Sequence, residues 1–595
     1  MASLSPETIL RQMEKMASSR TFRPAARQSS FLRYVVEESI EGRGHLLKEY
    51  SIGVAVFRKK ESFDPRLDSI VRTEARKLRV RLARYFEGEG KDDPVRIELP
   101  LGRYVPAFSG AGERTELTPG RRPLLFHVSS RNRAGLRIAV LPFVNRGASQ
   151  RDEYFTDGLT DELSHAFTRV QGLEVVARTS AFQFKGRPID IREVGQRLNV
   201  HALVEGSVRR SGQRVRILAQ LDDAIQGDTV WSQSYDRRLA DLLDVQQEIA
   251  ATITDELGNH FHVSKALQAP ARRQQALASA EPAVYQEYLQ GLYLWNRHTL
   301  EGFDAAIGCF ERAIGEDPRF ARAYASLAYC YGMLPILKAV LPSEFVPKMR
   351  VIASKALEID AGMGEAHIAM ALPLIHDYEW QSAGQEFSQG LALCPCDVVG
   401  HAWYGTFLAN VGRGEEALRE HARVLALDPA SPPAQYCYGQ TLYFLRRYDE
   451  AADQFRKALA LDASFPRAHA GLGLACIQKG SHLRGVAELE RAQELTPGLG
   501  RVKADLAYGY AVAGQRDKAQ AILSEFLGQF APASFPALMI AEIFIGLGDQ
   551  DSAFEWLHRA VDQKDISAFL GCDPLYDPLR SDPRFTALLK RTNLA

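Results

Sequence analysis

The second half of the chain carries apolar residues at three- and four-residue spacing, the pattern of amphipathic helices that pack against one another. The pattern recurs along the chain with a period of about 34 residues. Glycines mark the period at Gly405, Gly439 and Gly473. A second set keeps the same separation at Pro429, Ala463 and Pro497. A fixed period of this length predicts a stack of two-helix units, with small residues where helices cross and a proline that opens the next unit.

Further units extend the pattern in both directions, from Tyr288 to a window that begins at Ala537, and give about eight units in all. Over residues 281–595 the chain resembles the tetratricopeptide-repeat family. The resemblance implies an all-α solenoid whose concave groove holds a peptide or helix of a protein partner. The alternative is a scaffold that only spaces or dimerises the other domains. The tail from Asp573 is predicted to be a polar capping segment.

Between residues 136 and 262 the pattern changes to that of an α/β domain. Strands are predicted from short apolar or alternating runs at 137–143, 173–178, 201–210, 214–223 and 228–238. Helices are predicted at 153–170, 190–200 and 242–257. The segments between the last three strands have turn-forming residues, as expected for antiparallel neighbours. Trp231 and Tyr235 alternate along one strand and are expected to pack against the sheet.

The motifs IAVLPF, FTDGLTDEL, VVARTS, HALVEGSVRR and WSQSYDR together resemble the TolB N-terminal-like domain. In bacteria that domain often lies between an N-terminal signalling module and tetratricopeptide repeats. The resemblance implies a fold and a role in assembly, and it implies no reaction.

Three carboxylates in this domain could serve general acid–base or metal chemistry, namely Asp157, Asp161 and Glu162. Carboxylates in the first turn of a helix also stabilise its positive end. Asp157 or Thr160 would then be the N-cap residue. We favour this structural interpretation over catalysis.

Residues 1–108 combine amphipathic helices with a hairpin-like end. Helices are predicted at 28–42, 48–57 and 68–86, and a hairpin at 94–108. The longest helix has an apolar stripe that is expected to pack inward, formed by Val71, Ala75, Leu78, Leu82 and Tyr85. Between Val71 and Arg84 its neighbouring faces hold one acidic residue, Glu74, and six basic ones: Arg72, Arg76, Lys77, Arg79, Arg81 and Arg84.

The sequence VRTEARKLRVRL, followed by RIELPLGRYVP, resembles the recognition helix and wing of OmpR-type winged-helix regulators. The helix motif is matched by Lys77, Leu78, Arg79, Arg81 and Leu82. Gly102 and Tyr104 approximate the wing, where LGRYV lacks one of the two family glycines. The resemblance implies binding of double-stranded DNA by Arg72, Thr73, Arg76, Lys77, Arg79, Arg81 and, on the wing, Arg103. The alternative is a solvated basic helix with Glu–Arg pairs.

The distribution of charge adds to this picture. The whole chain of 595 residues has 73 Lys and Arg against 73 Asp and Glu, a formal net charge of zero. Bulk charge therefore predicts neither a polyanion binder nor a membrane-surface binder. Residues 1–108, however, hold 21 basic and 15 acidic side chains, a net charge of +6. The basic charge is concentrated in the region where DNA binding requires it.

We therefore expect a multidomain α+β protein of five consecutive parts. These are a winged helix at 1–108, a linker at 109–135, the α/β domain at 136–262, a second linker at 263–280, and the all-α solenoid at 281–595.

No motif predicts catalysis, a cofactor or a metal site. The seven cysteines have no disulfide or zinc spacing, and Cys394 and Cys396 are expected to be buried thiols. The GLGLAC sequence at Gly471 falls within a repeat helix, where small residues serve packing. The stretch Met1–Met16 lacks the apolar core of a signal peptide. No apolar run approaches the length of about 18 residues that a membrane-spanning helix needs.

The sequence thus predicts a non-enzymatic cytoplasmic regulator that does not contact membranes. Its expected partners are double-stranded DNA, a protein or peptide in the repeat groove and, because OmpR-type domains often bind in pairs, a second copy of itself. The alternative is an interaction scaffold, in a signalling or envelope-related assembly, that does not bind DNA.

Overall fold

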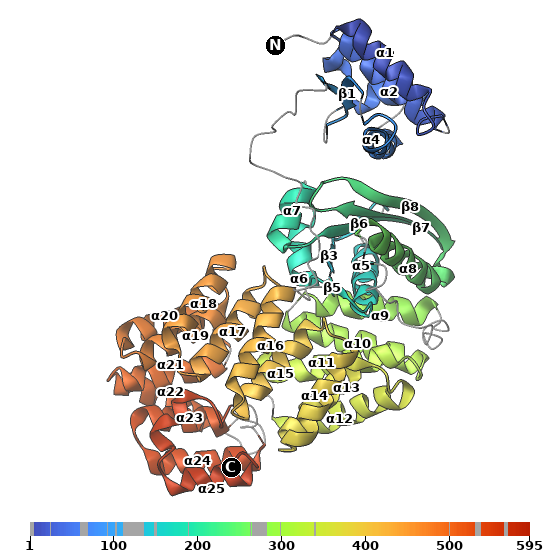
Figure 1. Ribbon diagram of the computed structural model, residues 1–595. Coiled ribbons are helices and arrows are strands. Elements are labelled where there is room, and N and C mark those ends of the chain that lie inside the picture. Colours follow the sequence, from blue (N-terminus) through green and yellow to red (C-terminus); the bar gives the residue numbers. More distant parts are fainter. Residues whose placement is uncertain are drawn as a thin grey trace. The chain divides into compact units, whose positions relative to one another are not determined.

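The computed structural model divides the chain into two compact units, Met1–Ala134 and Gly135–Ala595 (Figure 1). We call them the N-terminal unit and the C-terminal unit. The structure describes residues 5–23, 25–59, 70–91, 93–100, 104–110, 136–147, 152–187, 190–261, 263, 282–297, 299–337, 341–498, 500–529, 537–564 and 569–595. Both expected linkers fall largely outside these ranges.

The N-terminal unit consists of helices followed by a hairpin. Its described helices are α1 (Pro6–Ala17), α2 (Ala26–Ile40), α3 (Glu49–Ala55) and α4 (Ile70–Glu87). Strands β1 (Val95–Glu98) and β2 (Ala107–Gly110) pair antiparallel, with Val95 opposite Gly110. The three predicted helices and the hairpin are confirmed. Helix α1 is an addition, capped by the Ser5 side chain, which accepts a hydrogen bond from the Thr8 amide.

The apolar stripe of α4 forms the centre of this unit. Its five members are all buried: Val71, Ala75, Leu78, Leu82 and Tyr85. They pack with apolar side chains of α1, α2 and β1 into one core. The three-to-four-residue spacing therefore predicted the buried face of α4 correctly.

The C-terminal unit begins with a mixed sheet of strand order β5-β3-β6-β7-β8, with β4 beside β6. The strands are β3 (Leu136–Val140), β4 (Val144–Asn145), β5 (Leu173–Val175), β6 (Ala202–Ser211), β7 (Arg214–Asp223) and β8 (Thr229–Arg238). Strand β3 is parallel to β5 and β6, whereas β6, β7 and β8 form an antiparallel meander. All five predicted strands are confirmed.

Helices cover both faces of this sheet. They are α5 (Glu153–Thr168), α6 (Arg178–Ala181), α7 (Ile191–Leu198) and α8 (Leu242–His260). Alternate residues of β7 are buried in the core shared with α5 and α8, as the period of a strand requires. Tyr235 of β8 is buried and Trp231 packs against the same core, so both aromatic residues pack as expected.

Helix α5 begins at Glu153, as the sequence predicted, but its N-cap is neither of the two candidates. Its N-cap residue is Asp152, so neither Asp157 nor Thr160 is an N-cap. Phe155 is buried, so the first turn of the helix packs against the core. The three carboxylates at 157, 161 and 162 consequently lie beyond the first turn. Their proposed role at the positive end of the helix was therefore wrong.

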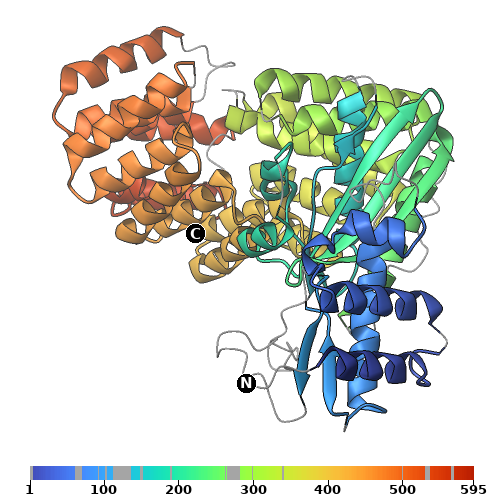
Figure 2. The same ribbon diagram turned by 90° about the horizontal axis from the view of Figure 1, so that it is seen from above.

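The rest of the chain is an array of antiparallel helix pairs. In the described residues there are eight pairs: α9 (Pro282–Trp295) with α10 (Leu300–Glu316), α11 (Ala321–Leu337) with α12 (Pro342–Ile359), α13 (Gly364–His376) with α14 (Trp380–Leu393), α15 (Val398–Asn410) with α16 (Gly414–Leu427), α17 (Pro432–Phe444) with α18 (Tyr448–Leu461), α19 (Pro466–Gln478) with α20 (His482–Leu495), α21 (Gly500–Val512) with α22 (Arg516–Gln529), and α23 (Ala537–Leu547) with α24 (Gln550–Asp562). They follow one another along a curved path (Figure 2).

The periodic glycines explain the close contact within each pair. A Cβ atom on Gly405 would lie 2.7 Å from His421 Nε2. On Gly439 it would lie 2.9 Å from the Phe455 ring, and on Gly473 it would lie 2.8 Å from the Gly485 carbonyl oxygen. Each glycine thus removes a side chain where the first helix of a pair crosses the second, as the sequence predicted.

The tail differs from the polar cap that the sequence predicted. It forms a short 3-10 helix, η6 (Pro574–Leu579), and the helix α25 (Pro583–Arg591). Its apolar side chains are buried: Leu575, Tyr576, Leu579, Phe585 and Leu588. Frequent Asp, Arg and Pro residues gave the segment a polar appearance, but these apolar residues pack against the last helix pairs.

Candidate functional site

The basic residues of α4 divide into side chains that bind their own unit and side chains that extend into solvent. Arg79 donates from Nε to the Leu99 carbonyl, at 3.0 Å, and from Nη2 to the Pro100 carbonyl, at 3.2 Å. Arg81 donates to the Thr21 carbonyl. The Arg79 contacts join α4 to the end of β1, and the Arg81 contact joins α4 to the segment after α1. Both arginines therefore help to position the unit's elements.

Lys77 and Arg84 are exposed on the same helix. The Lys77 side chain is 57% exposed, and its Nζ lies 2.9 Å from Glu74 Oε1. Glu74 itself is buried and accepts a hydrogen bond from Gln28 of α2. The one acidic residue between Val71 and Arg84 of this helix is thus a core contact. The side chains of Arg72, Thr73 and Arg76, and the whole of Arg103, lie outside the described residues.

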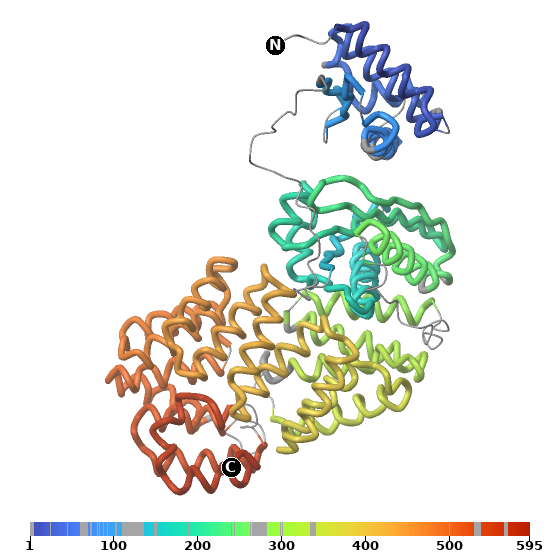
Figure 3. Tube along the Cα trace, viewed as in Figure 1, coloured from blue at the N-terminus to red at the C-terminus, as the bar shows by residue number. Residues whose placement is uncertain are grey.

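The α/β domain and the first helix pairs share one uninterrupted hydrophobic core. That core extends from Ile138 of β3 through Leu289 of α9 to Leu327 of α11. Gln246 of α8 donates a 2.8 Å hydrogen bond to the hydroxyl of Tyr285. Figure 3 shows α9 lying directly against α5 and α8 of the α/β domain. We call this contact the domain interface. The sequence predicts two separate domains here, and no motif in it signals this contact.

Two carboxylates of α5 are bound to cations of the α/β domain itself. Asp157 contacts Lys185 Nζ at 2.6 Å, and Asp161 contacts Arg178 Nε at 2.5 Å. Burial raises the pKa of Asp161 to about 7, and Arg178 opposes that rise. The nearby Asn296 side chain, just after α9, donates to Asp161 at 2.9 Å. These groups form a structural network across the interface.

Two ion pairs cross the domain interface. Glu162 of α5 binds Arg322 of α11. His165 Nε2 lies 3.0 Å from Glu365 Oε1 of α13. Burial opposes ionisation of Glu365, but His165 and Arg169 together hold the pKa of this carboxyl below its ordinary value. The first helices of three successive pairs therefore contact the α/β domain.

A second part of the domain interface lies farther along the array, at the loop between α16 and α17. The Ala177 amide donates to the Leu427 carbonyl at 2.8 Å. Ser180 Oγ donates to Asp428 Oδ1 at 2.5 Å and accepts from the Ala430 amide at 2.9 Å. Residues 177–183 thus bind this loop through one backbone amide and the side chains of Ser180 and Gln183. Ala430 is the last array residue for which such a contact with the α/β domain is found in the described part of the chain.

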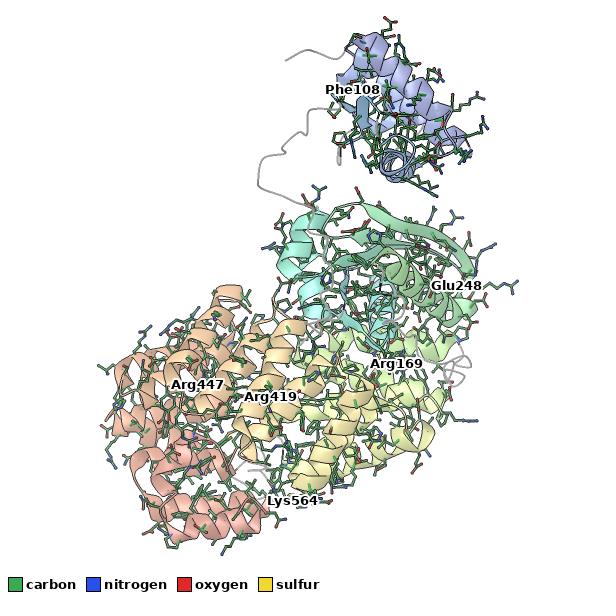
Figure 4. The ribbon with its side chains drawn as sticks, in the orientation of Figure 1. Phe108, Arg169, Glu248, Arg419, Arg447 and Lys564 are labelled. Carbon is green, nitrogen blue, oxygen red and sulfur yellow. The ribbon has the colours of Figure 1, made fainter. Side chains whose placement is uncertain are left out.

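Residues 569–593, which we call the C-terminal segment, cross back over the middle of the array. Trp380 Nε1 donates to the Thr592 carbonyl at 2.7 Å, and Gly571 N donates to Asn410 Oδ1 at 3.1 Å. Arg446 binds Asp577 and donates to the Cys572 carbonyl at 2.9 Å. Just before this segment, Lys564 pairs with Asp377 (Figure 4). The contacts involve the turns within three pairs, from α13 to α18.

These contacts change the expected picture of an open groove. The α/β domain covers part of the array from α9 to the α16–α17 loop, and the C-terminal segment covers the turns within the central pairs. No periodicity in the sequence signals either contact, because each joins residues more than 120 positions apart through single side chains and carbonyls.

The described residues contain neither a membrane-spanning helix nor a metal site. No helix there is long and apolar enough to cross a membrane. The same residues contain no group of three or more His, Cys, Asp or Glu arranged to hold a metal ion. Cys394 and Cys396 are both buried free thiols. Near the end of α8, His260 contacts Asp223 at 2.7 Å, and His262 lies outside the described residues.

Comparison with known proteins supports the repeat fold. A tetratricopeptide-repeat model matches residues 438–499, which span α17 to α20. A protein named "Putative adenylate cyclase 3" from Rhizobium meliloti (strain 1021) is 32% identical over 244 residues, 40% of this chain and 40% of that protein. The chain thus matches less than half the length of this relative.

Solved structures show similarity at low identity. Pseudomonas aeruginosa pilF is 21% identical over 38% of this chain and 97% of its own, with a TM-score of 0.29. YrrB, a TPR protein with an unusual peptide-binding site, is 21% identical over 32% of this chain and 93% of its own, with a TM-score of 0.24. With the match of the repeat model, the helix pairs of the array show that the chain contains tetratricopeptide repeats.

Proposed function

We propose that this protein is a non-enzymatic interaction scaffold that holds a protein partner on the helix pairs left uncovered by its own α/β domain. The proposal rests on the difference in solvent exposure between Leu427 and Leu461. They occupy equivalent positions, one period apart, at the ends of α16 and α18. Leu427 is fully buried where the α/β domain binds its carbonyl, whereas Leu461 is 46% exposed.

The loop that follows Leu461 repeats the chemistry of the occupied loop. Asp462 stands one period after Asp428, and its Oδ1 accepts from the amide of Ser464 within its own loop, at 2.9 Å. The α16–α17 loop receives amide and hydroxyl donors from residues 177–183. We propose that an extended segment of a partner docks on the α18–α19 loop with similar donors. This loop lies inside the range of the tetratricopeptide match.

The experiment is site-specific photo-crosslinking in cells that contain the full chain. A crosslinking amino acid replaces Leu461 in one variant. In the control it replaces Val351 of α12, which is 69% exposed. We expect one defined protein to crosslink at 461 and not at 351, and Leu461→Asp to prevent its recovery with the chain. Equal labelling at both positions, or none at 461, would contradict the proposal.

We assign no catalytic role to Asp157, Asp161 or Glu162. Each carboxylate is already bound to a lysine or an arginine. A general acid or base needs a free proton-accepting atom within reach of substrate. Charge-neutral pairs in a shared core serve assembly better than proton transfer.

As a second function, we propose that the N-terminal unit binds double-stranded DNA through α4 and the β1–β2 hairpin. Two observations favour it. Residues 1–108 carry a net charge of +6. The longest helix of the unit precedes an antiparallel hairpin and has exposed Lys77 and Arg84. An ammonium and a guanidinium group on one exposed helix supply donors for phosphate oxygens.

DNA binding is tested by titrating duplex DNA with the full chain as salt rises from about 50 to 200 mM, a change that lowers the affinity of a multi-phosphate contact by orders of magnitude. The test variant is Arg72→Ala/Arg76→Ala. The control, Arg11→Ala/Arg33→Ala, removes the same charge from α1 and α2. We expect the test variant alone to weaken binding at least about tenfold. Equal losses of DNA affinity in both variants would indicate that α4 is only a solvated basic helix.

A further inference from the structure

A small cavity lies where the C-terminal end of α5 meets three helices of the array. Its empty space is about 310 Å³, counting the part that opens to solvent. Arg169, the C-cap residue of α5, forms one side. Arg319, Phe320 and the first residues of α11 form another, and Asp360 and Met363 complete the lining. Figure 4 shows Arg169 at this junction of the two domains. We call it the arginine cavity.

Three guanidinium groups line the arginine cavity, and their donors are incompletely used. Arg319 is exposed, and among the described residues its side chain has no hydrogen-bond or ion-pair partner. Arg169 has only a distant ion pair with Glu365, at 3.9 Å. Arg322 is more than nine-tenths buried and binds Glu162 through Nη1. Its Nε–H is buried and has no acceptor in the described part of the chain.

The carboxylates around the cavity are too few to accept hydrogen bonds from all of these donors. Asp360 is the one acidic residue in the lining, and its Oδ1 already accepts from the Gly362 amide at 2.9 Å. Glu365 is shared between Arg169 and the closer His165.

The backbone adds to the positive potential. The 17-residue helix α11 begins at Ala321, on the cavity wall. The amides of Ala321 and Ala323 already donate to the carbonyls of Arg319 and Phe320, so the helix contributes its dipole. The positive end of a helix favours an anion. Guanidinium groups match the geometry of tetrahedral oxyanions, to which they can donate two hydrogen bonds at once.

We propose that the arginine cavity binds a doubly charged tetrahedral oxyanion, either inorganic phosphate or the phosphate group of an ester. The anion would accept from Arg319 and Arg169. Since these residues belong to both sides of the domain interface, the anion binds the assembled interface and stabilises it by mass action.

The experiment is calorimetric titration of the full chain with sodium phosphate at constant ionic strength, with chloride as the compensating anion. A second titration uses glycerol 3-phosphate, which presents the same group as an ester. The test variant is Arg319→Ala, whose exposed and unpaired side chain can be removed without loss of folding. The matched control is Arg419→Ala, an exposed arginine on α16 that is remote from the cavity.

We expect phosphate to bind wild type and Arg419→Ala alike, and Arg319→Ala about tenfold more weakly, as the loss of a charge-assisted hydrogen bond requires. Tighter binding of the ester than of phosphate would identify an ester as the source, and the reverse would identify free phosphate. The proposal is overturned if phosphate does not bind wild type at about 10 mM, or binds Arg319→Ala equally well. Because only the cavity arginine changes, phosphate bound to the basic N-terminal unit does not affect the comparison.

Discussion

Ser180 of the α/β domain and Asp428 of the helical array lie 248 residues apart in the sequence, and a 2.5 Å hydrogen bond joins them. Ser180 also accepts from the Ala430 amide. One hydroxyl thus satisfies an acceptor and a donor in the same loop. Burial raises the pKa of Asp428, and the bond from Ser180 partly counters that rise by stabilising the ionised form.

Ser180→Ala should destabilise the C-terminal unit by about 1–2 kcal/mol, because a buried carboxylate and a backbone amide each lose a partner. Urea unfolding followed by intrinsic fluorescence measures the loss. Ser464→Ala is the matched control, since Ser464 contacts Asp462 in the equivalent but exposed loop and should change stability by less than about 0.5 kcal/mol. Equal effects in both variants would show that the Ser180 bond adds nothing to the domain interface.

A histidine–glutamate pair recurs in the array at intervals of the repeat. His401 Nδ1 lies 2.6 Å from Glu420 Oε2, and its Nε2 lies 3.1 Å from the Pro395 carbonyl. The same arrangement occurs at His367 and His469. One period after His401 and Glu420, Gln435 and Gln454 occupy the corresponding positions. Each pair ties the first helix of a unit to the second.

We expect His401→Gln and Glu420→Gln each to destabilise the array by about 1–3 kcal/mol, and the double variant to cost less than the sum, since each single variant already removes the same His–Glu contact. Urea unfolding of the four proteins gives the coupling energy. Lys355 and Glu358, an exposed pair on α12, provide a control cycle in which coupling should be below about 0.5 kcal/mol. An additive result at 401 and 420 would contradict a direct interaction.

Arg446 should hold the C-terminal segment in place, because it binds Asp577 and the Cys572 carbonyl. Arg446→Met should increase amide hydrogen exchange across residues 569–593, about tenfold for a loss of about 1.4 kcal/mol, while exchange in α19 and α20 stays unchanged.

Arg447→Met is the control for this experiment. Arg447 follows directly in the chain and pairs with Glu450 of its own helix (Figure 4). It should leave exchange in the C-terminal segment at the wild-type level. If both variants exchange alike, the segment is held by its apolar side chains alone.

His421 makes the array sensitive to acid. It is buried against Gly405, and its Nδ1 lies 2.7 Å from Thr441 Oγ1. Burial lowers the pKa of His421 to about 4, whereas an unfolded histidine titrates near 6.5. The native state therefore disfavours the proton. The stability from this residue is fully present above about pH 6.5 and is lost as the pH falls toward 4.

Between pH 7 and pH 5 this residue alone should cost the array about 2 kcal/mol. His421→Gln should be less stable than wild type at pH 7 but should lose less stability on acidification to pH 5. Urea unfolding at the two pH values tests this difference. A pH dependence identical in wild type and variant would mean that His421 is not the titrating group.

Local pattern alone determined most of the secondary structure. The apolar stripe of α4 and the alternation in β7 predicted the buried faces, because a helix or strand with one apolar side has a single favourable way to bury it. The fixed period of the second half predicted helix pairs, because Gly405 and its counterparts leave no room for a side chain where two helices cross.

The tertiary structure decided which surfaces are covered and which charges are already bound. Leu427 and Leu461 are the same residue at the same repeat position, yet Leu427, whose carbonyl binds the α/β domain, is buried and Leu461 is exposed. Arg79 and Arg81 belong to a basic helix in the sequence, and the fold turns both toward carbonyl oxygens. Such contacts form between segments that are distant in the sequence. A sequence period reflects only the packing of each segment against its neighbours in the chain, so it cannot predict them.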